Sequence, residues 1–193
     1  MVLAGVALIG TFFFGQSLEN PATNDSNPGG FNVPQLDQGS GNANDVAGPK
    51  DKTLKLTVPS MSRVEGAKIP QAQGNDADAL DSNTAIHLEG TGYPWQEEAN
   101  VYIAGHRLGY PNTNSFLAFF DLDNLEDGDK MFLEDADGTK YTYKVFKEIT
   151  VSPTDISVTR PVSGKNVLTL QTCTLPDYSK RLIVQAELVN KEA

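Results

Sequence analysis

The feature that most constrains the fold is a series of short β-type segments that follow one another from Leu54 onward. Each segment is rich in Val, Ile, Thr, Tyr and Phe and ends at turn-forming residues, which is typical of strands. Strands are predicted at 54–58, 100–105, 130–134, 140–146, 166–173 and 181–189. Many strands with few helices favour a closed β-barrel, because closure removes exposed strand edges. We therefore predict a mostly β domain.

Two local signals lie between these strands. Asp137-Gly138 separates two of them and predicts a hairpin turn. The run SFLAFFDLDNL (115–125) favours a short helix that ends before a turn at 126–129. The expected domain is thus a barrel with one or two short helices.

The chain begins with an apolar segment, residues 1–15. The run MVLAGVALIGTFFF has no charged side chain, but it is shorter than the roughly 20 residues that span a bilayer. It also lacks the Lys/Arg flank of a signal or anchor. The outer part of a transmembrane helix, a signal-peptide core and a buried helix all fit this pattern. No A-x-A-like cleavage site follows it cleanly, which favours an uncleaved membrane anchor.

Residues 16–52 form a polar segment between this run and the barrel. They are rich in Asn, Gly, Asp, Ser and Pro, and such a composition buries too little apolar surface to offset the entropy cost of ordering. We predict a flexible extracytoplasmic spacer here, with an ordered loop around the domain as the alternative. The folded domain is then expected at 53–193.

The charge balance argues against one class of partner. The formal net charge is -10 and the sequence pI is about 4.6. A strongly acidic chain repels phosphate backbones, so nucleic-acid binding is not expected.

The single cysteine, Cys173, lies at the end of a predicted strand. A lone cysteine is either a buried apolar residue or a reactive thiol. Arg181 opens the next strand eight residues later, so it returns close to Cys173 if the two strands are neighbours. A guanidinium there would lower the thiol pKa and offer hydrogen-bond donors to a developing oxyanion. This arrangement favours the reactive thiol.

A second candidate residue is His106, which follows the apolar strand 100–105 directly. A histidine at a strand end suits general acid–base work, because its ordinary pKa lies near neutrality. The other histidine, His87, lies in the stretch AIHLEGTG and is the weaker candidate. Taken singly, Cys173, His106 and Arg181 each have a structural explanation, but their combination matches a family pattern.

The run TLQTC (169–173), Arg181 eight residues later and AGH (104–106) resemble the signature of the sortases, the cell-surface transpeptidases of Gram-positive bacteria. The similarity covers roughly residues 54–190. The resemblance implies a closed eight-stranded β-barrel with His106, Cys173 and Arg181 in its active site.

The resemblance also implies a reaction and its partners. Cys173 would attack the Thr–Gly carbonyl of a C-terminal sorting signal on a surface protein and form a thioester. His106 would protonate the leaving amine, while Arg181 orients the substrate and stabilises the oxyanion. An amine from a peptidoglycan stem peptide or cross-bridge, or from a pilin lysine, would then resolve the thioester. The family needs no metal cofactor for this chemistry.

Within the family, His106-Arg107-Leu108-Gly109-Tyr110 resembles the H-R-x-x-Y of class E sortases of high-GC Gram-positive bacteria. In that class the tyrosine is linked to preference for an L-A-x-T-G signal, so Tyr110 is expected to contact substrate. The run PNTNSFLAFF after Tyr110 departs from the pattern. Thr172, just before the nucleophile, is also expected to contact substrate, with a β-branched core residue as the alternative.

The acidic runs at 121–129 and 134–138 have the composition of calcium loops. Neither fits the D-x-[DN]-x-[DN]-G spacing, so we predict turns there and no metal site. Some sortases are calcium-stimulated, and weak stimulation is compatible with these runs.

The main prediction is a housekeeping sortase in the cell membrane, with a single membrane pass and an extracytoplasmic catalytic domain. A pilin-polymerising sortase is the alternative within the family. Such sortases often carry a lid with an Asp-Pro-aromatic motif, which neither Tyr93-Pro94-Trp95 nor Asn27-Pro28 matches. A non-catalytic surface-binding barrel would not need all three candidate residues.

Overall fold

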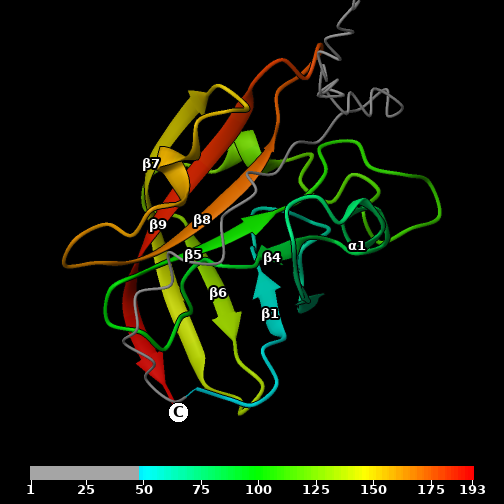
Figure 1. The fold of residues 1–193 in the computed structure, drawn as a ribbon. Coiled ribbons are helices and arrows are strands. Elements are labelled where there is room, and N and C mark those ends of the chain that lie inside the picture. The colour runs from blue at the N-terminus through cyan, green and yellow to red at the C-terminus, as the bar shows by residue number, and fades with distance from the viewer. Residues whose placement is uncertain (1–47) are drawn as a thin grey trace, which may run out of the picture.

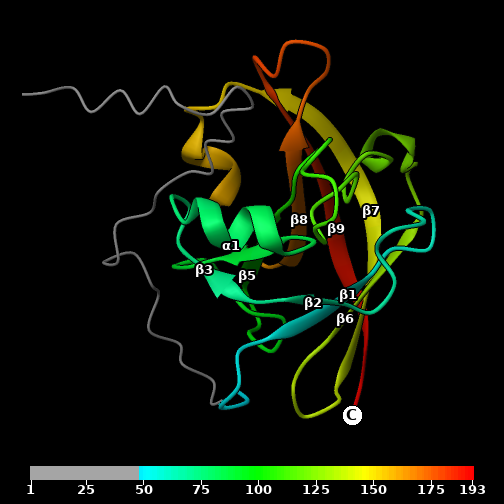
Figure 2. The ribbon, with the colours of Figure 1, turned by 90° about the vertical axis from the view of Figure 1, so that its right-hand side faces the viewer.

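One continuous sheet of nine strands curls into a nearly closed barrel in the computed structural model, which describes residues 48–193 (Figures 1 and 2). The strand order is β2-β1-β6-β7-β9-β8-β5-β4-β3. The strands are β1 (Leu54–Thr57), β2 (Ala67–Ile69), β3 (Gln71–Ala72), β4 (Ile86–Leu88), β5 (Ala99–Ala104), β6 (Lys130–Glu134), β7 (Lys140–Val151), β8 (Asn166–Cys173) and β9 (Arg181–Glu192). Three short helices join them, namely α1 (Ala77–Ser82), η1 (Leu122–Asn124) and η2 (Ile156–Thr159).

Alternating side chains divide the sheet into an inner and an outer face. Strand β1 alternates buried and more exposed positions, and its buried leucines join the apolar core inside the barrel. Strands β5 and β8 are buried at every position, because a second apolar cluster covers their outer face. That cluster contains Leu80 of α1, Val158 of η2 and Ile183 of β9. The barrel therefore carries an outer layer over β5, β8 and β9.

The strands predicted from the sequence are all present, within one or two residues at most ends. Strands β7 and β9 run further than expected, to Val151 and Glu192. The predicted hairpin is confirmed, since Gly138 has a φ of 88° and donates to Asp135 O at 3.0 Å. Nine strands replace the expected eight, a small difference that includes the two-residue β3.

The expected helix at 115–125 is confirmed only at its end, over Leu122–Asn124. The chain forms successive turns there, and only η1 is helical. The backbone N–H of Leu117 donates to Leu108 O at 2.8 Å, and that of Phe119 donates to His106 O at 3.0 Å. Leu117 also has a positive φ of 54°, outside the right-handed helical region. These two N–H groups therefore pair with the chain around His106 and do not continue a helix.

Residues just before position 53 also contact the domain. Gly48 is half-buried and lies against Trp95, where an added Cβ would lie 2.1 Å from the indole ring. The ammonium group of Lys52 lies 4.8 Å from the centroid of the Trp95 ring and 5.1 Å from that of Tyr93. The packed part of the chain thus begins no later than Gly48. The predicted anchor at 1–15 and the spacer up to residue 47 lie outside the described residues.

Within residues 48–193, no helix is long and apolar enough to cross a bilayer.

Candidate active site

Strand register brings the three predicted site residues to one end of the sheet. Cys173 is the last residue of β8 and lies opposite Arg181, the first residue of β9. Strand β5 runs parallel to β8 on its other side, with Ala104 opposite Gln171. Gly105 N–H continues this pairing by donating to Gln171 O at 3.0 Å. His106 therefore leaves β5 beside the end of β8, and Figure 1 shows β8 between β5 and β9.

Cys173 lies on the outer face of the sheet. Side chains alternate along a strand, so Cys173 shares a face with Gln171, which pairs with Ala104 and Ile183. Ala104 and Ile183 both belong to the outer apolar cluster, which includes Leu80 of α1. The thiol thus opens toward the layer that α1 and η2 form, not into the barrel interior.

The Cys173 thiol is 2% exposed. Burial raises the pKa of the Cys173 thiol above its usual range, while the positive charge of Arg181 opposes this rise. The resting thiol is therefore mainly neutral at neutral pH. Its activation requires a base that removes the proton as the thiol attacks.

Arg181 is also 2% exposed. Its Nη1 donates to Tyr178 O and to Lys180 O, both at 3.0 Å. These carbonyls belong to the loop that joins β8 to β9, so the loop holds the guanidinium at the end of the sheet where Cys173 lies. A fixed guanidinium of this kind suits the binding of a carbonyl or a developing oxyanion.

His106 is 7% exposed and contacts a carboxylate that the sequence did not identify. Its Nε2 lies 2.8 Å from Oδ1 of Asp81, on α1. The ring of Tyr110 meets the His106 ring edge-on, with centroids 5.5 Å apart. His106 is thus held between a helix and the loop that follows β5.

Tyr110 lies beside the site despite the unusual run after it. Gly109 has a φ of 59°, and an added Cβ there would lie 2.0 Å from Ser115 O. Only glycine fits this turn, which brings Tyr110 back to His106. Its N–H donates to Ser115 Oγ at 3.2 Å. A substrate contact of Tyr110 stays a prediction.

Thr172 lies between Gln171 and Cys173 and is fully buried. Its hydroxyl donates to Gly105 O at 2.8 Å and so ties β8 to the residue before His106. A substrate contact of Thr172 stays a prediction, and the hydrogen bond shows a positioning role for its hydroxyl.

Arg107, next to His106, is a further residue that the sequence did not single out for a role. Its Nη2 donates to Asp123 Oδ2 at 2.6 Å, and its guanidinium lies 5.5 Å from the centroid of the Phe120 ring. These contacts fasten the segment after β5 to the turns before β6.

His87 has a structural position. It is fully buried on β4, and its Nε2 lies 2.9 Å from Gly92 O. Burial lowers the pKa of His87 to about 4. His87 therefore stays neutral at physiological pH and packs inside the fold.

The acidic run 134–138 forms a turn, as predicted. The carboxylate of Asp135 accepts from Asp137 N, Thr139 N and Tyr141 Oη. Across residues 48–193, no group of three or more His, Cys, Asp or Glu side chains is arranged to hold a metal ion.

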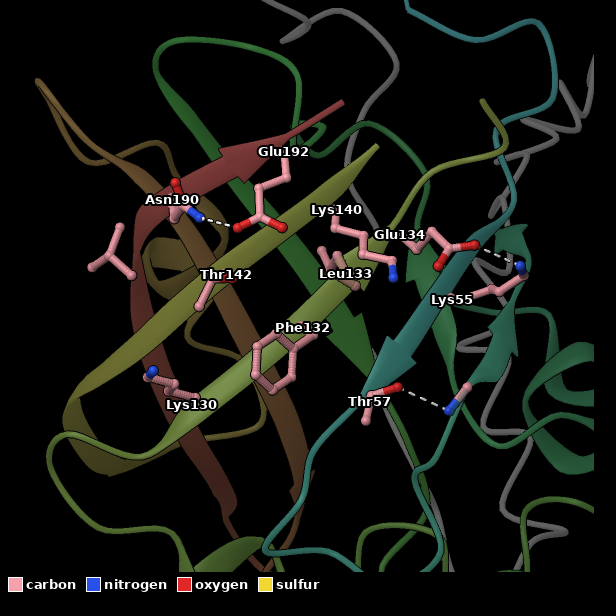
Figure 3. A pocket seen from close by; sticks show the side chains of 12 residues that line it. Lys55, Thr57, Lys130, Phe132, Leu133, Glu134, Lys140, Thr142, Asn190 and Glu192 are labelled. Carbon is pink, nitrogen blue, oxygen red and sulfur yellow. Dashed lines mark hydrogen bonds and ion pairs between the residues drawn. The ribbon is translucent and has the colours of Figure 1, made fainter. Parts of the chain in front are cut away.

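A groove of about 600 Å³ lies elsewhere, on the outward face of β1, β6, β7 and β9 (Figure 3). Its lining includes Lys55, Lys130, Phe132 and Glu134, with Lys55 Nζ 2.7 Å from Glu134 Oε1. None of the candidate catalytic residues lines this groove.

The sequence of this chain is similar to that of known sortases. A family model described as the sortase domain matches residues 56–189. Sortase A of Streptococcus agalactiae serotype III (strain NEM316) is 35% identical over 89 residues, which cover 46% of this chain and 36% of that protein. Sortase A of Bacillus anthracis is 33% identical over 140 residues, covering 72% of this chain and 60% of that protein. The chain thus matches less than two thirds of the length of either relative.

Solved structures show the same fold. Sortase C-1 of Actinomyces oris superposes with a TM-score of 0.60 and 28% identity, covering 71% of this chain and 73% of that one. Pilus Island 1 sortase C2 of Group B Streptococcus gives a TM-score of 0.60 and 27% identity, covering 74% and 77%. The match to the sortase domain, over most of the chain and including the end of the sheet where Cys173 lies, shows that this chain belongs to the sortase family.

Proposed function

We propose that this chain is a cysteine transpeptidase that cleaves an LAxTG- or LPxTG-like C-terminal sorting signal between Thr and Gly and transfers the protein to a cell-wall amine. The observation that carries the proposal is the strand register, which places Cys173 opposite Arg181 with His106 beside them. Membership of the sortase family supports the same reaction.

In the first step, Sγ of Cys173 bonds to the threonine carbonyl carbon and its proton passes to His106. Arg181 donates to the oxygen that becomes negative in the tetrahedral intermediate. The bond from carbon to the glycine nitrogen then breaks, and His106 returns the proton to that nitrogen. The products are a thioester on Cys173 and the released C-terminal peptide.

In the second step, an amine nitrogen attacks the thioester carbon. His106 takes a proton from this nitrogen, and the bond from carbon to Sγ breaks. The proton returns to Cys173, which leaves the thiol as it was before the first step. A neutral resting thiol, which burial of Cys173 favours, suits this cycle because the thiol carries its proton at the start and at the end of each turnover.

The substrate preference follows from the loop after β5. Tyr110 lies against His106, so a peptide that reaches the site passes close to its ring. This position and the H-R-x-x-Y pattern support a class E assignment, with LAxTG as the favoured signal and a housekeeping role in anchoring surface proteins.

A pilin-polymerising sortase is the second candidate. It is favoured by the fold match to a pilus sortase of Group B Streptococcus. The curated relatives named sortase A and the lack of an Asp-Pro-aromatic motif in the sequence favour the housekeeping role. The two candidates differ in the acceptor amine, which is a peptidoglycan amine in one and a pilin lysine in the other.

We also propose that residues 1–15 anchor the chain in the cell membrane and that the catalytic domain lies outside it. The support is the uncharged apolar run at the start of the sequence and the polar segment that follows. Membrane fractionation of the full chain, with carbonate washing, tests this placement. Release by carbonate would contradict an integral anchor.

The central experiment is mass spectrometry of the protein mixed with a panel of sorting-signal peptides and amines. We expect a thioester adduct on Cys173 with LAxTG or LPxTG peptides and a transpeptidation product with one class of amine. The C173A variant should keep its fold, since the thiol is small and lies at a strand end, and should form neither species. Peptide cleavage by folded C173A at the wild-type rate would refute the proposal.

A further inference from the structure

We infer that Asp81 is a positioning residue that orients His106. Its carboxylate holds the ring proton on Nε2 of His106, which leaves Nδ1 as the atom that takes and returns the proton of the reaction. The inference rests on the proposed function for the meaning of that proton transfer. The observation that carries it is the 2.8 Å contact between Oδ1 of Asp81 and Nε2 of His106.

The chemistry of the two atoms determines the tautomer. An ionised carboxylate has only acceptor oxygens, so the nitrogen that contacts it must carry the hydrogen. In a neutral imidazole the other nitrogen then holds the lone pair. A carboxylate that binds one nitrogen of a histidine in this way also stabilises the imidazolium that forms when the other nitrogen accepts a proton.

Helix α1 is built to hold Asp81 in place. Its first turn is capped by Asp76, whose Oδ1 accepts from Ala79 N at 2.9 Å. Its last turn is closed by Asn83, whose Nδ2 donates to Ala79 O at 2.7 Å. Both caps satisfy backbone groups that a short helix leaves without partners. The helix therefore keeps its shape although it has only six residues.

Packing fixes the helix against the sheet. Leu80, next to Asp81, is 4% exposed and packs in the outer cluster with Ala104 and Ile183. Ala104 lies two residues before His106 on β5. Packing of α1 on the end of β5 therefore brings Asp81, next to Leu80, close to His106, which follows Ala104 by two residues.

The surroundings of His106 favour a real interaction over a surface ion pair. The His106 side chain is 9% exposed and that of Asp81 is 32% exposed. The Tyr110 ring meets the imidazole edge-on. A hydrogen bond to a mostly buried ring is screened less by water than one between two exposed groups.

In the reaction, Nδ1 of His106 accepts the proton of the Cys173 thiol as Sγ bonds to the threonine carbonyl carbon. The same nitrogen then gives this proton to the glycine nitrogen as the peptide bond breaks. The Nε2–H bond to Asp81 persists in both states. Asp81 touches neither substrate nor thiol in this sequence, so its effect passes through His106.

The test compares three variants in the peptide-cleavage assay. D81A removes the acceptor, D81N keeps an oxygen acceptor without the charge, and D78A removes an exposed carboxylate from the same helix. General acid–base catalysis typically contributes about 10²–10⁴ in rate, and loss of the partner that orients a metal-bound histidine, a comparable hydrogen bond, typically costs about 10- to 100-fold. We expect kcat to fall about 10- to 100-fold in D81A and less in D81N, with KM nearly unchanged. D78A should match the wild type.

A second measurement keeps the inference testable if D81A is poorly folded. Long-range ¹⁵N–¹H NMR of the full chain reports which nitrogen of His106 carries the proton. We expect the Nε2–H form in the wild type and a shift toward Nδ1–H in D81A. An Nδ1–H form in the wild type, or wild-type kcat in folded D81A, would overturn the inference. Equal losses in D81A and D78A would do the same.

The two proposals fail in different ways. If the wild-type protein forms no adduct with any peptide, the proposed function fails, while the tautomer of His106 still decides the role of Asp81. If the wild type is active and D81A is equally active, only the role of Asp81 is removed.

Discussion

Replacement of His87 by Gln should make the free energy of unfolding less dependent on pH below pH 7. His87 is fully buried on β4, and burial lowers its pKa from 6.5 to about 4. Gly92 O can only accept, so Nε2 of His87 carries the hydrogen. Within the described part of the chain, Nδ1 of His87 has no hydrogen-bond partner. Protonation would therefore place an unpaired hydrogen and a positive charge in the fold.

The sign of the effect follows from proton linkage. Between pH 6.5 and pH 4 the unfolded chain binds a proton at His87 that the folded chain does not bind, so stability falls as the pH is lowered. Each pH unit between the two pKa values is worth about 1.4 kcal/mol, which gives a total loss of about 3 kcal/mol. Of this loss, about 2 kcal/mol falls between pH 7 and pH 5.

The assay is urea unfolding of the wild type and H87Q at pH 7, 6 and 5. Glutamine can still donate to Gly92 O but does not titrate, so H87Q should lose about 2 kcal/mol less than the wild type between pH 7 and pH 5. H106Q is the matched control, because the chain has only two histidines and this variant keeps His87. Parallel profiles for the wild type and H87Q would refute the reasoning.

Three further predictions concern the site and the boundary of the domain. R181K should lower turnover by about 10²–10³, as loss of an oxyanion donor does. It should lower the free energy of unfolding by only about 1–2 kcal/mol, because the guanidinium also bonds to loop carbonyls. Normal turnover per folded molecule would contradict this prediction. Alkylation of Cys173 by iodoacetamide should be slow at neutral pH and accelerate only at alkaline pH, because burial raises the thiol pKa. In R181A the midpoint of the rate–pH curve should move to still higher pH, because the charge that opposes this rise is lost. An unchanged midpoint in R181A would contradict an electrostatic effect of Arg181 on the Cys173 thiol. A chain that starts at Gly48 should keep full activity. A chain that starts at Thr53 should be less stable by about 1 kcal/mol or more, because it loses the contacts of Gly48 and Lys52 with Trp95. Equal thermal midpoints of the two chains would show that these contacts do not stabilise the fold.

The barrel strands could be predicted from local pattern because each was a run of β-branched and aromatic residues between turns. Strand β8 is the clearest case, since all of Asn166–Cys173 is buried and the run is rich in Val, Leu and Thr. The pairing of Cys173 with Arg181 was also accessible, because a short loop joins neighbouring strands and so returns the chain to the same end of the sheet.

The segment 115–125 shows where local pattern misleads. Its apolar residues fit a helix in spacing, but the N–H groups of Leu117 and Phe119 donate to Leu108 O and His106 O. Four residues of the segment, Ala118, Phe119, Leu122 and Leu125, are buried in the barrel core. Burial against the barrel and pairing with the chain after β5 therefore outweigh the helical preference, and neither is visible in the segment itself.

Asp81 is a site residue that could not be predicted from the sequence. It is one of 25 acidic residues, and it lies 25 positions before His106 in a six-residue helix with no strong periodic signal. Its role depends on the caps of α1 and on the packing of Leu80 against Ala104. Sequence motifs marked the residues that would meet the substrate, whereas the residue that orients His106 is defined only by how the outer layer packs on the sheet. Functional carboxylates of this kind are therefore found by tracing the second partner of each catalytic group in the folded chain.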